Sequence, residues 1–193
     1  TAGAPPPAGP VVRGIAAAVL LARGRAAGAQ AFAPTLAEAR ASFVAALVCL
    51  PIFLLLRGVS GPGAAAGADP ARALAADLIA YVCSWAGFAL ASLPLAEAMG
   101  RRALWPRLVA AWNWVNLVQY VVLAGFTIPV LLGLSGLPAD ALGLAAIGYA
   151  LWLQWFTARA ALGVTGGRAA GFVVLDLGLA LFLSGLVQRL SVP

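Results

Sequence analysis

The chain has 193 residues, of which 63% are hydrophobic and 9% charged, and its mean hydropathy is +0.99. A water-soluble domain carries roughly 25% charged residues, so this composition excludes water as the main solvent and indicates a membrane protein. Every basic residue is an arginine and there is no histidine, which removes the commonest general base and metal ligand. The arginines form no patch interleaved with exposed aromatic residues, so no nucleic acid is expected as a partner.

Residues 1–34 are expected to form a flexible tail followed by a segment on the cytoplasmic surface of the membrane. The first ten residues are rich in proline, alanine and glycine and show no signal-peptide pattern. The segment 11–30 is too charged to cross a bilayer and is typical of an interfacial helix. Arg13, Arg23 and Arg25 would then contact anionic phospholipid headgroups, each contributing about 1 kcal/mol. A partly ordered linker is the alternative, because three glycines interrupt the segment.

Residues 35–193 are expected to form a single all-α domain, a bundle of five transmembrane helices. Thr35-Leu36-Ala37-Glu38 is a capping box that predicts a helix start, and Pro51 predicts a kink in that helix. Asp69-Pro70, an N-cap followed by proline, predicts the start of the second helix. Each apolar run is near the roughly 20 residues that a hydrocarbon core requires. The predicted spans are 41–57, 75–99, 108–132, 141–162 and 169–187.

The arginines also predict the orientation of the chain. Nine of the twelve fall on one side of the predicted spans, and only Arg57, Arg72 and Arg189 fall on the other. The positive-inside rule then places the N-terminus in the cytoplasm, and an odd number of spans places the C-terminus on the far side. The alanine, glycine and arginine bias is typical of a high-GC bacterial sequence, so the expected location is the bacterial inner membrane, with a periplasmic C-terminus.

Small residues predict which helix faces pack, because there is little hydrophobic drive between helices in lipid. The second and fourth spans each carry such a face, whereas the opposite face of the fourth span is aromatic and is expected to meet lipid or another subunit. The small faces comprise Ala80, Ser84, Gly87, Ala91 and Ala98, and Gly143, Ala150, Gln154, Ala158 and Ala161; the aromatic face comprises Tyr149, Trp152, Trp155 and Phe156.

Polar side chains on the last three spans form the candidate site. The side chains of the third span lie within one narrow sector of the helix at about 100° per residue. An intramembrane carboxylate is costly, and this one lies roughly 10 Å inside the cytoplasmic end, a depth that Arg159 can also reach. The candidate residues are Asn113, Asn116 and Tyr120 on the third span, Gln154 and Arg159 on the fourth, and Asp176 on the fifth.

Two interpretations of this polar cluster are open. It forms a solute path or binding pocket, or it forms interhelical hydrogen bonds worth roughly 0.6 kcal/mol each. The second is favoured, with Asp176 paired to Arg159 or hydrogen-bonded to Asn113 and Asn116. Proton transfer is disfavoured because a relay needs several acids or histidines in series, and here there is one carboxylate.

The remaining acids and the cysteines are expected to be structural. Glu97 lies near the arginines of the turn that follows it, and Asp140 opens the fourth helix, where a negative charge favours the dipole. Asp77 is ambiguous. Cys49 and Cys83 are interpreted as small buried apolar side chains, because neither has partners at the spacing of a disulfide or zinc site.

Several short sequences accompany this architecture: Ser42-Phe43 with Pro51 in the first span, Gly100-Arg101 after the second, Trp112-Asn113-Trp114 in the third, and Leu175-Asp176 in the fifth. With five spans and a cytoplasmic N-terminus, the chain resembles the Yip1-like superfamily and the uncharacterised bacterial multi-pass proteins related to it. The resemblance covers nearly the whole length. It implies a membrane-organising or partner-binding protein without catalytic activity, and it supplies no functional residues.

The expected function is therefore a non-catalytic bundle that scaffolds or associates with other membrane proteins or with itself. No catalytic triad, phosphate loop, haem-ligand pair or cofactor fingerprint is present, so neither enzyme activity nor a cofactor is expected. One alternative is an accessory subunit of an energy-transducing membrane complex. Another is a small-solute channel or transporter that uses the polar face of the third span and Asp176.

Overall fold

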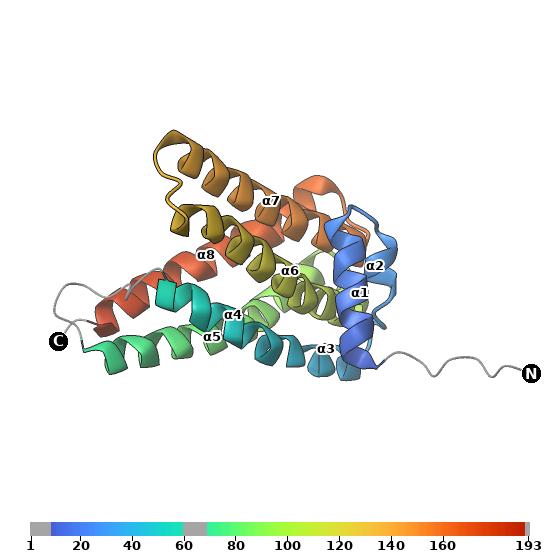
Figure 1. Ribbon diagram of the computed structural model, residues 1–193. Coiled ribbons are helices and arrows are strands. Elements are labelled where there is room, and N and C mark those ends of the chain that lie inside the picture. Colours follow the sequence, from blue (N-terminus) through green and yellow to red (C-terminus); the bar gives the residue numbers. More distant parts are fainter. Residues whose placement is uncertain (1–8, 60–68, 192–193) are drawn as a thin grey trace, which may run out of the picture.

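A computed structural model describes residues 9–59 and 69–191, which form eight α-helices, one short 3₁₀ helix and no strand (Figure 1). The elements are α1 (Pro10–Ala22), α2 (Ala27–Gln30), α3 (Leu36–Ser42), α4 (Val44–Val59), α5 (Pro70–Ala98), η1 (Arg102–Leu104), α6 (Trp105–Leu131), α7 (Leu137–Leu162) and α8 (Gly166–Ser191).

Five helical stretches are long and apolar enough to cross a membrane, which confirms the predicted fold class. Each predicted span falls on one of them, and the helices begin several residues earlier because their caps and first turns lie outside the most apolar part of each run. The five stretches are Leu36–Val59, Pro70–Ala98, Arg102–Leu131, Leu137–Leu162 and Gly166–Leu190.

The first span begins where the capping box predicts but is divided into two helices. The Thr35 hydroxyl accepts a hydrogen bond from the Glu38 backbone N–H at 3.2 Å, as in an N-cap. The chain leaves α-helical hydrogen bonding at Phe43, between α3 and α4, whereas α4 continues through Pro51. The prediction of one helix over this span was therefore wrong at Phe43.

Local chemistry also explains the other helix ends. The Asp69 carboxylate accepts a hydrogen bond from the Ala71 N–H at 3.0 Å, with Pro70 in the first turn, which confirms the predicted start of α5. Asp140 lies in the first turn of α7, as predicted. Gly163 ends α7 with a φ of 62°, a left-handed conformation that glycine adopts without strain.

The long helices run roughly side by side, and α1 lies across one end of them (Figure 1). Helix α5 packs along α8, and α6 packs along α7. Helix α4 packs on α6, and α7 also contacts α8 next to the turn that joins them. The α6–α7 hairpin and the α5–α8 pair diverge away from α1, so the bundle is tight at the α1 end and open toward the other.

The N-terminal segment is an ordered helical part of the bundle and not a linker. Gly14 of α1 lies against the Trp114 indole so closely that a Cβ there would collide with the ring. The Tyr149 hydroxyl donates to the Ala22 carbonyl at 2.9 Å. These contacts hold α1 against α6 and α7.

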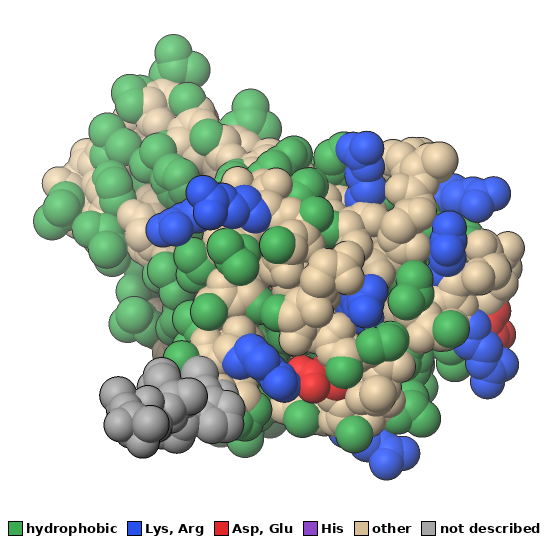
Figure 2. Space-filling model, turned by 90° about the vertical axis from the view of Figure 1, so that its right-hand side faces the viewer, with side chains coloured by type: hydrophobic (Ala, Val, Ile, Leu, Met, Phe, Trp, Pro, Cys, Tyr) green, Lys and Arg blue, Asp and Glu red, His purple; other side chains and the backbone are tan. Residues whose placement is uncertain are grey.

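Figure 2 looks onto the α1 end of the bundle, where arginine side chains are spread across the surface. The nine arginines that the sequence places on one side lie on α1, α3, η1, the turns at this end, and the nearest ends of α6, α7 and α8. Two contacts bring these segments together: Arg101 donates to the Gly163 carbonyl at 3.3 Å, and Arg107 donates to the Phe32 carbonyl at 3.0 Å. Nearer the opposite end, Arg57 of α4 forms an ion pair with Asp77 of α5, which assigns the acid that the sequence left ambiguous.

Candidate functional site: a cavity inside the bundle

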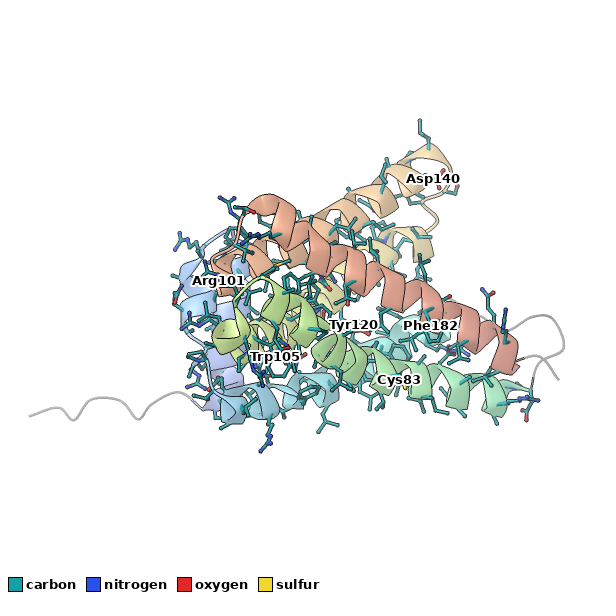
Figure 3. The ribbon with its side chains drawn as sticks, turned by 180° about the vertical axis from the view of Figure 1, so that it is seen from behind. Cys83, Arg101, Trp105, Tyr120, Asp140 and Phe182 are labelled. Carbon is teal, nitrogen blue, oxygen red and sulfur yellow. The ribbon has the colours of Figure 1, made fainter. Side chains whose placement is uncertain are left out.

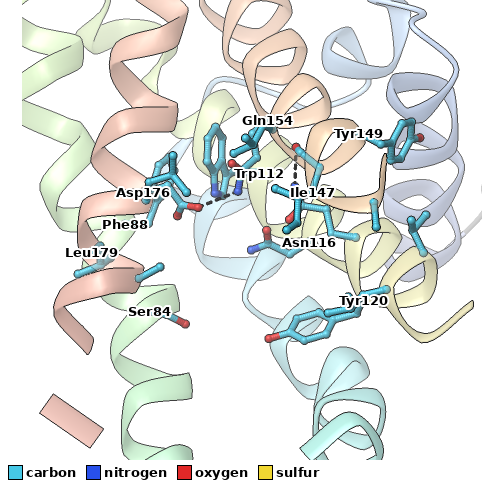
Figure 4. A pocket seen from close by; sticks show the side chains of 18 of the residues that line it. Ser84, Phe88, Trp112, Asn116, Tyr120, Ile147, Tyr149, Gln154, Asp176 and Leu179 are labelled. Carbon is cyan, nitrogen blue, oxygen red and sulfur yellow. Dashed lines mark hydrogen bonds between the residues drawn. The ribbon is translucent and has the colours of Figure 1, made fainter. Parts of the chain in front are cut away.

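A cavity of about 400 Å³ lies among α5, α6, α7 and α8, where the two helix pairs begin to diverge (Figure 4). Phe88 of α5 and Trp112 of α6 line its inner part, and their rings stack with centroids 4.0 Å apart. Trp85 and Tyr120 add two further aromatic side chains to the lining. The cavity is therefore largely apolar, with a few polar groups at defined positions, which is the usual character of a small-molecule site.

Five of the six candidate residues line this one cavity. They come from three consecutive helices, α6, α7 and α8. They are Asn113, Asn116, Tyr120, Gln154 and Asp176.

Arg159 does not line the cavity. Its guanidinium carbon lies 5.4 Å from the centroid of the Trp155 ring, and the side chain is exposed. The expected ion pair between Arg159 and Asp176 is therefore wrong.

Asp176 is held by an amide. Gln154 Nε2 donates to Asp176 Oδ2 at 2.7 Å, and Figure 4 shows the Trp112 side chain beside the same carboxylate. The expected bonds from Asp176 to Asn113 and Asn116 are not formed. A neutral partner leaves the negative charge of the carboxylate uncompensated.

Asn113 connects α6 to the break in the first span. Asn113 Nδ2 donates to Ser42 Oγ at 2.9 Å, and Ser42 Oγ in turn donates to the Ala39 carbonyl at 2.7 Å. Both side chains are buried. This chain of bonds is the interhelical hydrogen bonding that the structural interpretation expected, but its partner is α3 and not α8.

Gln119 is a cavity residue that the sequence analysis did not select. Its Nε2 donates to the Ala150 carbonyl of α7 at 3.1 Å, and it lies three residues, or about 60° around the helix, from Asn116. The regular spacing of Asn113, Asn116 and Gln119 is the signal that identifies it. The polar face of α6 is wider than the narrow sector expected from the sequence, because it meets two neighbouring helices.

The chemistry of their partners fixes how these amides are oriented. The Ala150 carbonyl and the Asp176 carboxylate can only accept, and the Ser42 hydroxyl uses its proton on Ala39. The atom of Asn113, Gln119 and Gln154 that faces each partner must therefore be the amide nitrogen. The carbonyl oxygen of each amide is left as an acceptor.

The aromatic face of α7 packs on the N-terminal segment of the same chain. Besides the bond from Tyr149 to Ala22, the Trp152 ring lies near Gly24, where a Cβ would meet it at 3.7 Å. Trp155 Nε1 donates to the Gly166 carbonyl at 2.9 Å. Tyr149 and Trp155 are thus hydrogen-bonded within the chain, whereas Trp152 is 38% exposed, and contact of this face with lipid or another subunit stays a prediction.

The three arginines proposed as lipid contacts differ in their surroundings. Arg13 makes two hydrogen bonds to the Glu38 carboxylate, at 2.7 and 2.9 Å, so it joins α1 to α3. Arg23 and Arg25 are exposed in the turn between α1 and α2.

The two cysteines occupy different environments. Cys49 is buried, as expected, but Cys83 is exposed on α5 (Figure 3), so that part of the interpretation was wrong. Within residues 9–59 and 69–191 there is no group of three or more His, Cys, Asp or Glu side chains that could hold a metal ion.

The chain was also compared with known proteins. No protein-family model, no curated protein and no solved structure matches it.

Proposed function

We propose that this chain is a non-catalytic multi-pass membrane protein that binds a small solute in the cavity among α5, α6, α7 and α8, as a carrier or channel. The observation that carries the proposal is the convergence of polar side chains from three helices on one cavity. Asn116 and Tyr120 line it without a side-chain hydrogen bond to another described residue. An unsatisfied polar group is costly in hydrocarbon, so water or a ligand is needed there.

The arrangement of the lining supports a site with one closed end. Gln154, Asp176 and the Phe88–Trp112 stack lie at the inner end, whereas Leu123 and Ala180 lie farther from α1. A solute would therefore enter from the side on which the helix pairs diverge.

The arginine distribution supports the proposed orientation. With the α1 end in the cytoplasm, the nine arginines gathered there satisfy the positive-inside rule, and the cavity opens toward the periplasmic side of a bacterial inner membrane. Arg23 and Arg25 would then lie among anionic phospholipid headgroups.

Cysteine accessibility tests whether the cavity is open to water. In a variant with Cys49→Ala and Cys83→Ala, Asn116→Cys places a thiol in the cavity. Val121→Cys is the control, because Val121 lies on the same helix, is 53% exposed, and does not line the cavity. We expect membrane-impermeant methanethiosulfonates to label the first thiol and not the second, because only a hydrated thiol ionises and reacts. An Asn116→Cys thiol that stays unlabelled until the protein is denatured would show that the cavity is dry, and the proposal would fail.

Association with other membrane proteins is a second candidate function. Gly125 on α6 and Gly143 and Gly148 on α7 have no atom within 4 Å of an added Cβ, so these small residues are not used for packing inside the described chain. In lipid, small residues favour helix association. The Yip1-like resemblance and the accessory-subunit alternative both belong to this candidate.

Purification in mild detergent tests the second candidate. Recovery with one stoichiometric partner, or as a defined oligomer, supports it. A monodisperse monomer that has no partner in native membranes contradicts it.

A further inference from the structure

We infer that the cavity is selective for an organic monocation with an apolar body, held between the Asp176 carboxylate and the aromatic wall. The inference rests on the proposed solute-binding function and names the class of solute.

The charge of the cavity is the first reason. Among the described residues, Asp176 is the only formally charged side chain that lines it, and none of the described arginines does. Elsewhere in the described chain, Arg13 pairs with Glu38, Arg57 with Asp77 and Arg102 with Glu97. The neighbours of Asp176 are instead the neutral amide of Gln154 and the neutral indole of Trp112, so no arginine of the described chain pairs with this carboxylate. A cation gains more from such a charge in a low-dielectric site than it would in water.

The wall of the cavity is the second reason. Trp85, Phe88, Trp112 and Tyr120 line the same cavity as the carboxylate. The face of an aromatic ring carries negative charge density, so it attracts an organic cation and also packs against its apolar groups. An anion would be repelled by the carboxylate and by the negative faces of the same rings.

The amides of the lining are the third reason. Gln119 and Gln154 each use their nitrogen on a protein acceptor, so each keeps a carbonyl oxygen. Such oxygens accept hydrogen bonds from an ammonium or another N–H group. The polar part of the lining thus complements a donor that carries positive charge.

The size of the cavity favours an organic ion over a metal ion. A volume of about 400 Å³ lies in the usual range of roughly 300–1,000 Å³ for small-molecule pockets. A bare metal ion needs several ligands converging on one point, whereas a single carboxylate lies here. The aromatic and aliphatic lining instead matches a ligand with a sizeable apolar body.

Binding of two ions that share a shape and differ in charge tests the inference. Radiolabelled tetraphenylphosphonium and tetraphenylborate are measured against the full chain in lipid nanodiscs, with empty nanodiscs subtracted. We expect saturable binding of the cation only. Asp176→Asn is expected to weaken cation binding by about tenfold or more, whereas Asp140→Asn is the matched control because Asp140 is exposed in the first turn of α7 and outside the cavity.

A second pair of variants keeps the test decisive if Asp176→Asn does not fold. Ala180→Trp fills the cavity from α8, and its neighbour Leu181→Trp adds a similar ring to a position that is 74% exposed and outside the cavity. We expect the first variant to lose cation binding and the second to keep it, with gel filtration showing that both are folded.

The outcomes separate this inference from the proposed function. Equal binding of the two ions, or unchanged cation binding in folded Asp176→Asn, overturns the cation class while a labelled Asn116→Cys thiol still supports a solute site. An unlabelled thiol together with no binding of either ion overturns both.

Discussion

Asn113 and Asn116 lie on the same face of α6, yet they do different things. Asn113 is buried and bonded to Ser42, so its role is to hold α6 against α3. Asn116, one helical turn farther along, faces the cavity. The structural interpretation of the polar cluster thus applies to Asn113, and the binding-pocket interpretation applies to Asn116. The reason is that the tight α1 end of the bundle supplies a hydrogen-bond partner, whereas the region where the helix pairs diverge does not.

The Asn113–Ser42 bond leads to a prediction about stability. In a double-mutant cycle of Asn113→Ala and Ser42→Ala, we expect a coupling energy of about 0.6 kcal/mol and at most about 1.7 kcal/mol, because the membrane-inserted unfolded state also finds partners. Denaturation by sodium dodecyl sulfate in mixed micelles measures it. Additive effects of the two substitutions would contradict the bond.

The Arg57–Asp77 ion pair leads to a second prediction at this scale. The two side chains are 16% and 19% exposed, so removing one charge leaves the other largely desolvated. We expect Asp77→Asn to reduce the free energy of unfolding by about 3 kcal/mol, and replacement of both residues by methionine to restore much of that loss. The same denaturation assay measures both variants, with Asp140→Asn as the exposed control. A double variant as unstable as the single one would show that the charge was not the cause.

At the scale of elements, the docking of α1 depends on one glycine. Gly14 lets the helix approach the Trp114 ring, and Leu21 and Phe32 of the same segment are fully buried. The aromatic face of α7 therefore has a partner inside the chain. Less of this aromatic face is therefore left for contact with lipid or another subunit.

Replacing Gly14 tests this docking. Alanine usually stabilises a helix interior by about 1 kcal/mol relative to glycine, so a Gly14→Ala variant that is destabilised reports the collision with Trp114. We expect faster hydrogen exchange of the α1 amides and lower stability. Gly143→Ala in α7 is the control, since no atom lies within 4 Å of its added Cβ, and it should be neutral or slightly stabilising. Unchanged exchange in Gly14→Ala would contradict the tight contact.

At the scale of the whole molecule, two helix pairs meet at the arginine-rich end and separate toward the other. The same divergence creates the cavity and gives the protein two unlike ends. Under the proposed function, orientation in the membrane decides from which compartment a solute enters.

Reporter fusions test the orientation. Because nine of twelve arginines gather at the α1 end, we expect a green fluorescent protein fused to the N-terminus to be fluorescent and alkaline phosphatase fused to the C-terminus to be active in a bacterial host. Inactive phosphatase together with a fluorescent C-terminal fusion would place both termini in the cytoplasm and contradict five crossings.

The sequence alone determined the solvent, the spans and several helix starts. Lipid offers no hydrogen bonds to the backbone, so a crossing must be a helix of about 20 apolar residues, and a composition profile suffices to find it. The helix caps at Thr35 and Asp69 can also be predicted from the sequence, because each hydrogen bond joins residues two or three positions apart. The polar face of the third span follows from the helical period.

Which polar residues meet one another depends on how the helices pack. Gln154 and Arg159 lie five residues apart on α7, or about 140° around the helix, so both cannot face Asp176, and nothing in the local sequence shows which one does. The structure selects Gln154 and turns Arg159 toward Trp155. The cavity has the same origin, because its shape depends on the angle between two helix pairs, and that angle is set by contacts such as Gly87 of α5 against Leu179 of α8 between residues distant in sequence.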